Sequence, residues 1–254
     1  MPGGGRGLPG NHDAVLIRVY PDFESVSFAA ADLFVRRAGE AAAARGRFSA
    51  ALSGGGTPQR SYELLGAPPH RDRVDWERVH IFWGDERCVP WDDPRSNARL
   101  AYQAWLNRVP LPGRQIHPLD CTLAPAAAAR RYEALLGEFF GGGPPRLDLV
   151  FLGLGENGHT ASLFPHTPVL KEQERWVAAV YLAAEDLYRV TLTAPILNQA
   201  AQAVFLVTGP SKARVLKEVL YGAYDPERLP AQLIRPAAGE LLWLVDQAAA
   251  AELK

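Results

Sequence analysis

The chain contains little cysteine, and its apolar stretches are short. Only two cysteines, Cys88 and Cys121, occur among its 254 residues, which excludes a framework of disulfides and indicates a reducing compartment. No apolar segment approaches the roughly 20 residues that cross a bilayer, and residues 1–11 lack the apolar core of a signal peptide. We therefore expect a cytoplasmic location and no membrane partner.

A large excess of charge of either sign is also missing. The chain has 27 basic and 28 acidic residues and a net charge of −1, so no nucleic-acid partner is expected. The length and the 48% of hydrophobic residues fit one catalytic α/β domain over residues 13–254, after a disordered Gly- and Pro-rich tail over residues 1–12. Composition leaves open whether the protein is a monomer or a small homo-oligomer.

Short apolar segments alternate with helical patterns along the chain. Strands are predicted at 15–19, 48–52, 79–83, 147–152, 176–180, 189–193, 203–207 and 241–245. Helices are predicted at 22–44, 59–65, 97–107, 125–140, 195–201 and 213–221, with another beginning at Thr160 and an Ala-rich helix after the last strand. This alternation predicts an α/β fold with a doubly wound, mostly parallel sheet flanked by helices.

Four of the predicted strands end in loops that carry polar or glycine residues. These strands end at Leu52, Trp83, Leu152 and Val207. Because the carboxyl ends of parallel strands meet at one edge of a sheet, the four loops should converge. The sequence therefore predicts a single active site at that edge.

The first of these loops reads Ser-Gly-Gly-Gly-Thr-Pro and precedes a helix. Ser53, Gly54, Gly55, Gly56 and Thr57 offer unhindered backbone amides and two hydroxyls, a combination that suits a phosphate or a sugar hydroxyl. The simpler alternative is a tight turn between a strand and a helix, but such a turn needs only one glycine. No Gly-Lys-Ser or Gly-Lys-Thr is present, so this is not a Walker loop.

The second loop, Trp83-Gly-Asp-Glu-Arg87, places acids and an arginine at a strand end. Arg87 has the geometry to hold a phosphate with two hydrogen bonds, while Asp85 would orient a partner or a substrate hydroxyl. The alternative is a solvated charged turn. Its position after an aromatic strand end favours the binding interpretation.

The third loop, starting at Gly153, formally fits the pattern G-x-G-x-x-G. A dinucleotide site would need an acidic residue at the end of the next strand about 20 residues on, and the acids near that distance lie in a loop. The pattern instead runs through Gly158 into His159. At the predicted helix start, His159 would stay neutral and able to act as a base near pH 7. The alternative is a hydrogen-bonded core histidine.

Three further side chains have both a functional and a structural interpretation. Lys212, just before a helix, is either a phosphate-binding cation or a surface lysine. Arg189 begins a strand, where a charge often marks an exposed edge. Cys88 could act as a nucleophile with His159, but an inert, buried thiol is favoured. The histidines show no spacing typical of metal ligands, so no metal site is predicted.

Together these motifs resemble those of the 6-phosphogluconolactonase family. The segments Ser53–Pro58, Trp83–Arg87, Gly155–Pro165, Arg189–Thr193 and Gly209–Lys212 occur in the order seen in that family and span nearly the whole chain after the tail. The string His-Thr-Ala-Ser-Leu-Phe-Pro is the most specific element. The resemblance implies a Rossmann-like α/β fold that is shared with glucosamine-6-phosphate deaminases.

The resemblance also implies an activity, namely hydrolysis of 6-phospho-D-glucono-1,5-lactone to 6-phosphogluconate in the pentose phosphate pathway, without metal or organic cofactor. His159 would be the general base that activates water, and Asp85 would lie in the same site. The phosphorylated sugar lactone would be bound by Ser53, Gly54, Gly55, Gly56, Thr57, Arg87, Gly158, Arg189 and Lys212. A lactone is a reactive ester, so one base and donors for the oxyanion are enough.

Two positions depart from the usual pattern of the family. Its loop more often reads Gly-Gly-Ser-Thr-Pro, so Gly56 removes a hydroxyl and offers only its amide. Asp is common where Asn157 stands, so no carboxylate is expected to assist His159 from that position.

The nearest alternative is an amino-sugar-phosphate deaminase or isomerase on the same fold. Those enzymes resemble this chain at Gly-Glu-Asn-Gly-His but usually continue Ile-Ala-Phe-Asn, and they carry Met-Asp-Glu-Tyr where Trp-Gly-Asp-Glu-Arg stands here. The other alternative is a non-catalytic sugar-phosphate-binding protein. Regulators of that kind usually carry a DNA-binding segment, which the short N-terminal tail does not provide.

Overall fold

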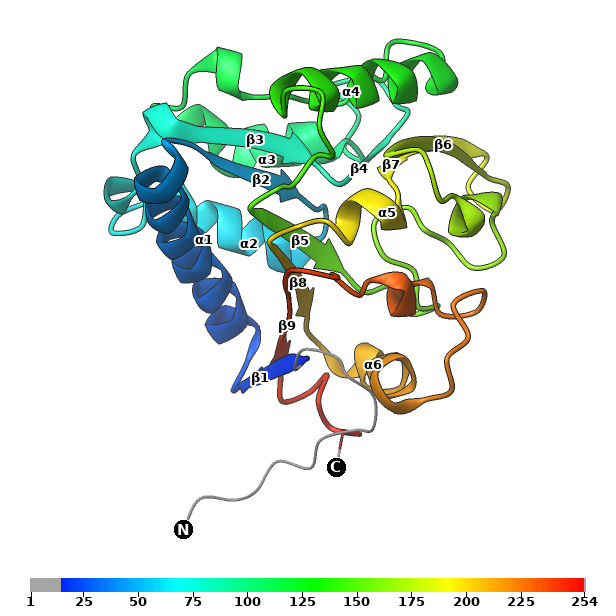
Figure 1. Ribbon diagram of the computed structural model, residues 1–254. Helices are drawn as coiled ribbons and strands as arrows, with labels where there is room; N and C mark the ends of the chain where they lie inside the picture. Colours follow the sequence, from blue (N-terminus) through cyan, green and yellow to red (C-terminus); the bar gives the residue numbers. More distant parts are fainter. Residues whose placement is uncertain (1–14, 254) are drawn as a thin grey trace.

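A six-stranded parallel sheet forms the centre of the molecule (Figure 1). The computed structural model describes residues 15–253. Within this range the strands of the large sheet are β1 (Leu16–Tyr20), β2 (Phe48–Leu52), β3 (Val79–Trp83), β5 (Leu149–Gly153), β8 (Gln202–Val207) and β9 (Glu240–Asp246), in the spatial order β1-β9-β8-β5-β2-β3. Every neighbouring pair runs parallel, as the alternation of strands and helices predicts.

The direction of the chain across this sheet reverses between β2 and β5. From β2 the chain moves outward to β3, whereas from β5 it moves to β8 and then β9 on the other side. The loops that leave the carboxyl ends of β2 and β5 therefore diverge. In open α/β sheets, the crevice formed at such a reversal is the usual place for a ligand.

A second, antiparallel sheet continues from the carboxyl end of β3. It contains β4 (Asp85–Arg87), β7 (Leu187–Leu192) and β6 (Val177–Leu182), in the order β4-β7-β6. Gly84 joins the two sheets, because its N–H donates to Leu52 O at 2.8 Å and its carbonyl accepts from Leu192 N at 2.8 Å. The prediction of a loop at 84–87 was wrong, since these charged residues form a strand only by pairing with distant β7.

Helices cover both faces of the large sheet (Figure 1). They are α1 (Phe23–Arg45), α2 (Gly56–Leu65), α3 (Asn97–Ala104), α4 (Pro125–Phe139), α5 (Ala194–Leu197) and α6 (Ala213–Tyr221). Short 3₁₀ turns lie at Arg71–Arg73, Trp76–Arg78, Leu106–Arg108, Gly113–Gln115, Pro168–Lys171, Pro210–Lys212 and Pro230–Leu233. Asp22 caps α1 by accepting from Ser25 N at 2.8 Å, and Gly46 ends it with a φ of 74°.

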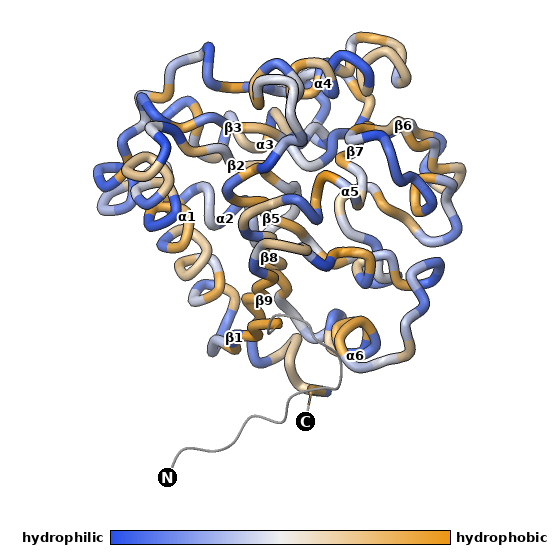
Figure 2. The backbone as a smooth tube through the Cα atoms, viewed as in Figure 1, coloured by the Kyte–Doolittle hydropathy of each residue, from blue (hydrophilic) through white to orange (hydrophobic). Residues whose placement is uncertain are grey.

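The core lies on both sides of the central strands. Every residue of β2 and β8 is buried, and the hydrophobic segments of these strands run through the interior in Figure 2. Phe205 of β8 and Trp243 of β9 stack with their ring centroids 3.9 Å apart. Burial on both faces explains why these strands are mostly apolar instead of alternating, with Ser49 in β2 and Gln202 in β8 as the polar residues.

Two predicted helices are absent from the described residues. The segment after β5 forms turns and a bridge between Thr160 and Leu163, so no helix begins there. Ala161 has a φ of 48°, and Pro165 disfavours helical backbone at the residue before it. After β9, residues 247–252 form successive turns, which is consistent with the marginal stability of short helices.

The predicted tail at residues 1–12 lies outside the described residues. Among residues 15–253, no helix combines the length and apolar character needed to span a membrane.

Candidate active site

A cavity of about 300 Å³ lies at the carboxyl ends of the central strands. Its lining comes mainly from the loops that follow β2, β5 and β8 and from β4, as the convergence of the four loops predicts, with Asn97 of α3 and Arg189 of β7 added to them. The lining residues are Ser53, Gly54, Gly55, Gly56, Thr57, Pro58, Asp85, Arg87, Asn97, Gly153, Leu154, Gly155, His159, Ala161, Arg189, Leu206, Val207, Thr208 and Lys212. The structure thus brings together every predicted site residue except Gly158.

Gly158 has a structural role in the turn before His159. Its φ is 79°, and an added Cβ would lie 2.6 Å from a methyl group of Leu229. Its carbonyl accepts from Ala231 N at 2.9 Å. Gly158 therefore allows the turn before His159 to pack against the segment around Leu229, and its position does not support the predicted contact with substrate.

The glycine-rich loop is fixed at Ser53, and its far end leads into α2. Tyr62, which is fully buried, accepts from Ser53 N at 3.0 Å and donates to Ser53 O at 2.9 Å. Gly55 has a φ of 106°, and no side chain caps the first amides of α2. These amides and the positive end of the helix dipole create an anion-binding position.

Two contacts tie this loop to its neighbours. Thr57 Oγ1 and Thr208 Oγ1 are 2.7 Å apart, which joins the loops after β2 and β8. A Cβ on Gly54 would lie 2.1 Å from Asn97 Oδ1, so α3 packs directly on this glycine. Tight packing, rather than backbone conformation, is thus what requires glycine at position 54.

His159 is fixed in one tautomer by Asn157. Asn157 Oδ1 lies 2.6 Å from His159 Nδ1 and accepts from His159 N at 3.2 Å. A backbone N–H can only donate, so the atom that faces both nitrogens is the amide oxygen. Nδ1 therefore carries the proton, and Nε2 is left as the free acceptor of the ring.

The surroundings of His159 keep the imidazole neutral. Its ring stacks on Phe164, with centroids 4.0 Å apart, and a Cβ on Gly155 would lie 2.0 Å from Nδ1. Burial lowers the pKa of His159 to about 4, with Asp85 opposing the shift and Arg189 and Lys212 adding to it. The predicted helix dipole is not the cause, because no helix begins here.

Asp85 is a buried carboxylate with partners on three sides. Its Oδ2 accepts from Ser162 Oγ at 2.7 Å, and its Oδ1 lies 3.3 Å from Asn97 Nδ2. Arg189 NH1 stands 3.9 Å from Oδ2. These contacts fix the orientation of the Asp85 carboxylate, so Asp85 is a rigid part of the cavity wall.

The charge of Arg189 is largely compensated within the protein. Its NH2 donates to both carboxylate oxygens of Glu185, at 2.8 and 2.7 Å, and Asp85 lies on the other side. Its guanidinium also stands 5.2 Å from the ring of Phe164. Phe164 is thus close to both Arg189 and the imidazole of His159.

The two other cations have fewer ionic partners among the described residues. Arg87 donates through NH1 to the Arg95 carbonyl at 2.6 Å, which is a neutral acceptor. Lys212 Nζ is 4.0 Å from Glu156, whose side chain is largely exposed. The positive charges of these two residues therefore remain available to an anion in the cavity.

Sequence reasoning missed several members of this network. Asn97 is buried and donates to Asp85 O at 2.9 Å, while its Oδ1 has no hydrogen-bond partner among the described residues. Glu86 positions Asn97, because the Glu86 carboxylate accepts from Asn97 N at 2.8 Å and from Ala98 N at 2.7 Å. Burial raises the pKa of Glu86. The sequence offers one signal here, because Ser96 stands directly before the helix predicted at 97–107 and serine commonly caps helices.

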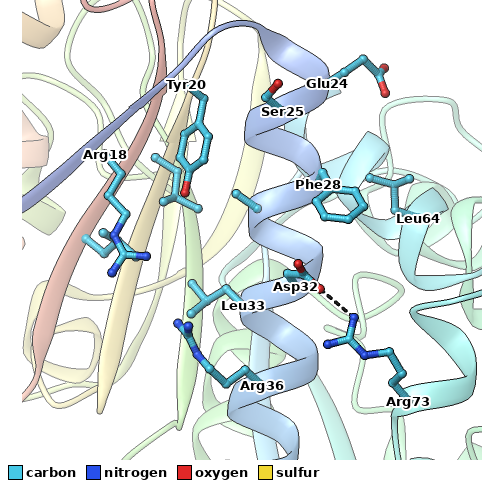
Figure 3. A pocket seen from close by; sticks show the side chains of 13 residues that line it. Arg18, Tyr20, Glu24, Ser25, Phe28, Asp32, Leu33, Arg36, Leu64 and Arg73 are labelled. Atoms are coloured by element: carbon cyan, nitrogen blue, oxygen red, sulfur yellow. Dashed lines mark hydrogen bonds and ion pairs between the residues drawn. The ribbon is translucent and has the colours of Figure 1, made fainter.

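A second, larger hollow lies between β1, β9 and α1 (Figure 3). Its volume is about 860 Å³, and it is bordered by Arg18, Arg36 and Arg73, with Asp32 bonded to Arg73 at 2.8 Å. None of the predicted site residues lies there. The smaller cavity is the candidate active site, because it collects the glycine-rich loop, the imidazole and the cations.

The described part of the chain contains no group of three or more His, Cys, Asp or Glu side chains placed to hold a metal ion. His80 and His117 form a pair away from the cavity, with Nδ1 and Nε2 3.2 Å apart.

A parallel α/β sheet with an anion-binding loop and a neutral imidazole at its carboxyl edge is typical of enzymes that act on phosphorylated small molecules. Residues 21–243 match the family model described as glucosamine-6-phosphate isomerases/6-phosphogluconolactonase. The chain belongs to this family.

Three individual proteins show how similar this chain is to characterised sequences and solved structures. A 6-phosphogluconolactonase from Synechocystis sp. is 45% identical over 219 residues, which cover 85% of this chain and 88% of the relative. The solved 6-phosphogluconolactonase from Trypanosoma brucei has a TM-score of 0.82 at 27% identity, covering 95% of this chain and 99% of that one. A monomeric glucosamine-6-phosphate deaminase has a TM-score of 0.79 at 21% identity, covering 93% and 99%. The deaminase shows the shared fold alone.

Proposed function

We propose that this protein hydrolyses 6-phospho-D-glucono-1,5-lactone to 6-phosphogluconate in the oxidative branch of the pentose phosphate pathway. The protonation pattern of His159 is the observation that carries the proposal. Asn157 Oδ1 accepts a hydrogen bond from Nδ1–H, so Nε2 is free to accept a proton at the cavity. The 45% identity to a named 6-phosphogluconolactonase supports the same activity.

His159 is the general base in this proposal. Its Nε2 takes a proton from water as the oxygen of that water attacks the lactone carbonyl carbon. The tetrahedral intermediate collapses by breaking the bond between this carbon and the ring oxygen. The imidazolium of His159 then returns its proton to the departing ring oxygen, which becomes a hydroxyl group of the open-chain acid.

Burial is the main cause of the pKa of about 4 that makes free His159 a weak base, and the positive charges of Arg189 and Lys212 add to the shift. A bound phosphate, with a charge near −2, offsets the charge of Lys212. The pKa of His159 therefore rises when substrate binds, which improves the base in the complex that reacts.

The phosphate and the lactone ring occupy different ends of the cavity in this proposal. Lys212 and the first amides of α2 hold the phosphate, because Lys212 is paired only with the exposed carboxylate of Glu156 at 4.0 Å and no side chain caps these amides. Arg87 adds a second cation on the side of α3. Arg189, already paired with Glu185 and Asp85, lies near His159 and stabilises the developing oxyanion.

We propose that residues 13–254 work as one catalytic domain in the cytoplasm, as a monomer or a small homo-oligomer, with the sugar lactone as the small-molecule partner. The free thiols of Cys88 and Cys121 are consistent with a reducing compartment.

The test compares two reactions on the purified protein. Lactone hydrolysis above the spontaneous rate, without ammonia release from glucosamine 6-phosphate, supports the lactonase. Ammonia release without lactone hydrolysis would establish the deaminase or isomerase instead. Binding of 6-phosphogluconate without either reaction would establish a non-catalytic sugar-phosphate-binding protein.

A further inference from the structure

Glu185 lies on the turn between β6 and β7, four residues before Arg189 and outside the lining of the active-site cavity. Its two carboxylate oxygens accept from Arg189 NH2 at 2.8 and 2.7 Å. The next residue, Asp186, has a φ of 48° and accepts from the Tyr181 hydroxyl at 2.5 Å. Glu185 therefore acts on the cavity through Arg189.

The guanidinium of Arg189 depends on this contact. Arg189 is only 7% exposed and lines the cavity. Its NH1 stands 3.9 Å from Asp85 Oδ2, which is too far for a hydrogen bond, and its Nε has no hydrogen-bond partner among residues 15–253. Within that range, Glu185 thus accepts the only hydrogen bonds of the guanidinium. A buried guanidinium without these bonds would need another anion.

The charge balance of the cavity also depends on Glu185. The cationic side chains of Arg87, Arg189 and Lys212 line the cavity, together with the carboxylate of Asp85. Glu185 compensates Arg189 at hydrogen-bond distance from outside this lining, whereas the ion pair of Lys212 spans 4.0 Å. Without Glu185, Arg189 would be a strong competitor for an anion, because a guanidinium binds phosphate through two parallel hydrogen bonds.

The position of Arg189 makes such binding unproductive. Its guanidinium stands 5.2 Å from the ring of Phe164, and the imidazole of His159 stacks on the same ring with centroids 4.0 Å apart. A phosphate on Arg189 would therefore lie beside the base, in the place that the lactone carbonyl must take for His159 to activate water against it. A substrate bound in this direction is held but does not react.

We propose that Glu185 determines the direction in which the substrate binds in the cavity. By neutralising Arg189, it leaves Lys212 and the first amides of α2 as the preferred position for the phosphate. The lactone ring is thereby kept at the end of the cavity where His159 lies. Glu185 is a positioning residue, because it acts on the substrate through Arg189. This role rests on the proposed function for its substrate, but the preference for phosphate can be measured without turnover.

Binding of inorganic phosphate to the full-length protein tests the charge of Glu185 without catalysis. Glu185→Gln retains a carbonyl oxygen as acceptor for Arg189 and removes the charge. We expect this variant to bind phosphate at least about threefold more tightly than the wild type, because the guanidinium becomes available. Asp186→Asn is the matched control, since it removes a charge from the same turn, asparagine tolerates the left-handed backbone, and its affinity should be that of the wild type. Unchanged or weaker binding by Glu185→Gln would overturn the proposal.

A second substitution identifies the residue that holds the phosphate. Lys212→Ala should weaken phosphate binding about tenfold in the wild type, because a charge-assisted contact is lost. In Glu185→Gln the same change should weaken it by less than about threefold, because Arg189 receives the anion. Arg189→Ala should return Glu185→Gln to the wild-type affinity. Equal effects of Lys212→Ala in the two backgrounds would show that Glu185 and Lys212 act independently, and would overturn the proposal.

Turnover provides a readout that a merely structural role would not move. For the phosphorylated lactone, Glu185→Gln should lower kcat and KM together by about threefold or more, because reversed substrate occupies the site without reacting. Gluconolactone has no phosphate for Arg189 and should be hydrolysed as by the wild type. A loss of kcat for both lactones, with a lower Tm, would overturn the proposal in favour of a structural role. Absence of lactone hydrolysis in the wild type would instead refute the proposed function, and phosphate binding would still test Glu185.

Discussion

The amide oxygen of Asn157 lies 2.6 Å from Nδ1 of His159 and is also the acceptor for the backbone N–H of that residue. One side chain thus fixes both the turn and the tautomer of the proposed base. A carboxylate is not needed for this contact, although it is common at this position in the 6-phosphogluconolactonase family. An amide orients the ring but adds no negative charge beside it.

Replacing Asn157 separates orientation from charge. Asn157→Leu removes the acceptor, so the tautomer is no longer fixed and kcat should fall by about tenfold or more. Asn157→Asp keeps the acceptor and adds a negative charge that stabilises the imidazolium and raises the pKa of His159. The acid limb of the pH profile of kcat/KM should then move to higher pH. Identical profiles for the wild type and Asn157→Asp would contradict this role.

The charge of Lys212 should be visible in the pH dependence of the free enzyme. The wild-type kcat/KM should be lost as the pH falls through about 4, where His159 becomes protonated. Lys212→Met removes a charge that disfavours the imidazolium, so the pKa of His159 rises and the limb moves to higher pH. Lys217→Met is the matched control, because Lys217 lies in α6, is exposed and is outside the cavity lining. A shift to lower pH in Lys212→Met would refute the assignment.

Substrate binding should also move this limb. The limb of kcat reports the enzyme–substrate complex, whereas that of kcat/KM reports the free enzyme. Because the bound phosphate offsets the positive charge of Lys212, the kcat limb should lie at higher pH than the kcat/KM limb. Coincident limbs would show that the phosphate does not act on His159.

Phosphate recognition should distinguish Lys212 from Arg189. Lys212→Ala should raise KM for the phosphorylated lactone by about tenfold or more, because a charge-assisted contact is lost, and should affect unphosphorylated gluconolactone far less. Arg189→Ala should lower the turnover of both lactones. Equal effects of Lys212→Ala on the two substrates would exclude a phosphate contact.

Gly54 offers a test of packing in the loop. In Gly54→Ala, the new Cβ would meet Asn97 Oδ1 at 2.1 Å, and moving Asn97 would disturb its hydrogen bonds to Asp85. We expect the free energy of unfolding to fall by about 1–3 kcal/mol, seen as a lower Tm. Gly56→Ala is the control, since no heavy atom lies within 4 Å of its added Cβ. Equal losses of stability would show that Asn97 does not constrain the loop.

Much of this fold follows from local sequence patterns. The strands β2 and β3 lie at the predicted bounds, because each is a mostly apolar segment, interrupted only by Ser49 in β2 and His80 in β3. The glycine-rich loop after Leu52 and the helix that follows it could also be predicted, from residues 53–58. The prediction that four loops converge needed only the rule that parallel strands end at one edge.

What the sequence did not reveal depends on pairing between distant segments. The strand character of Asp85–Arg87 arises from β7, about a hundred residues later. The compensation of Arg189 by Glu185 and the position of Asn97 against Gly54 also need the folded chain. The helix predicted at Thr160 failed because Pro165 and the left-handed Ala161 interrupt it. The neutral state expected for His159 is found, but burial replaces the helix dipole as its cause.

Turnover of 6-phosphogluconolactone by His159→Ala, compared with the wild type after subtraction of the spontaneous rate, tests the proposed mechanism most directly. Circular dichroism and binding of 6-phosphogluconate show whether the variant is folded with its site intact. We predict a folded variant that binds 6-phosphogluconate and has lost about 10²–10⁴-fold in kcat, the usual contribution of a general base. A folded His159→Ala protein with wild-type turnover would contradict the account.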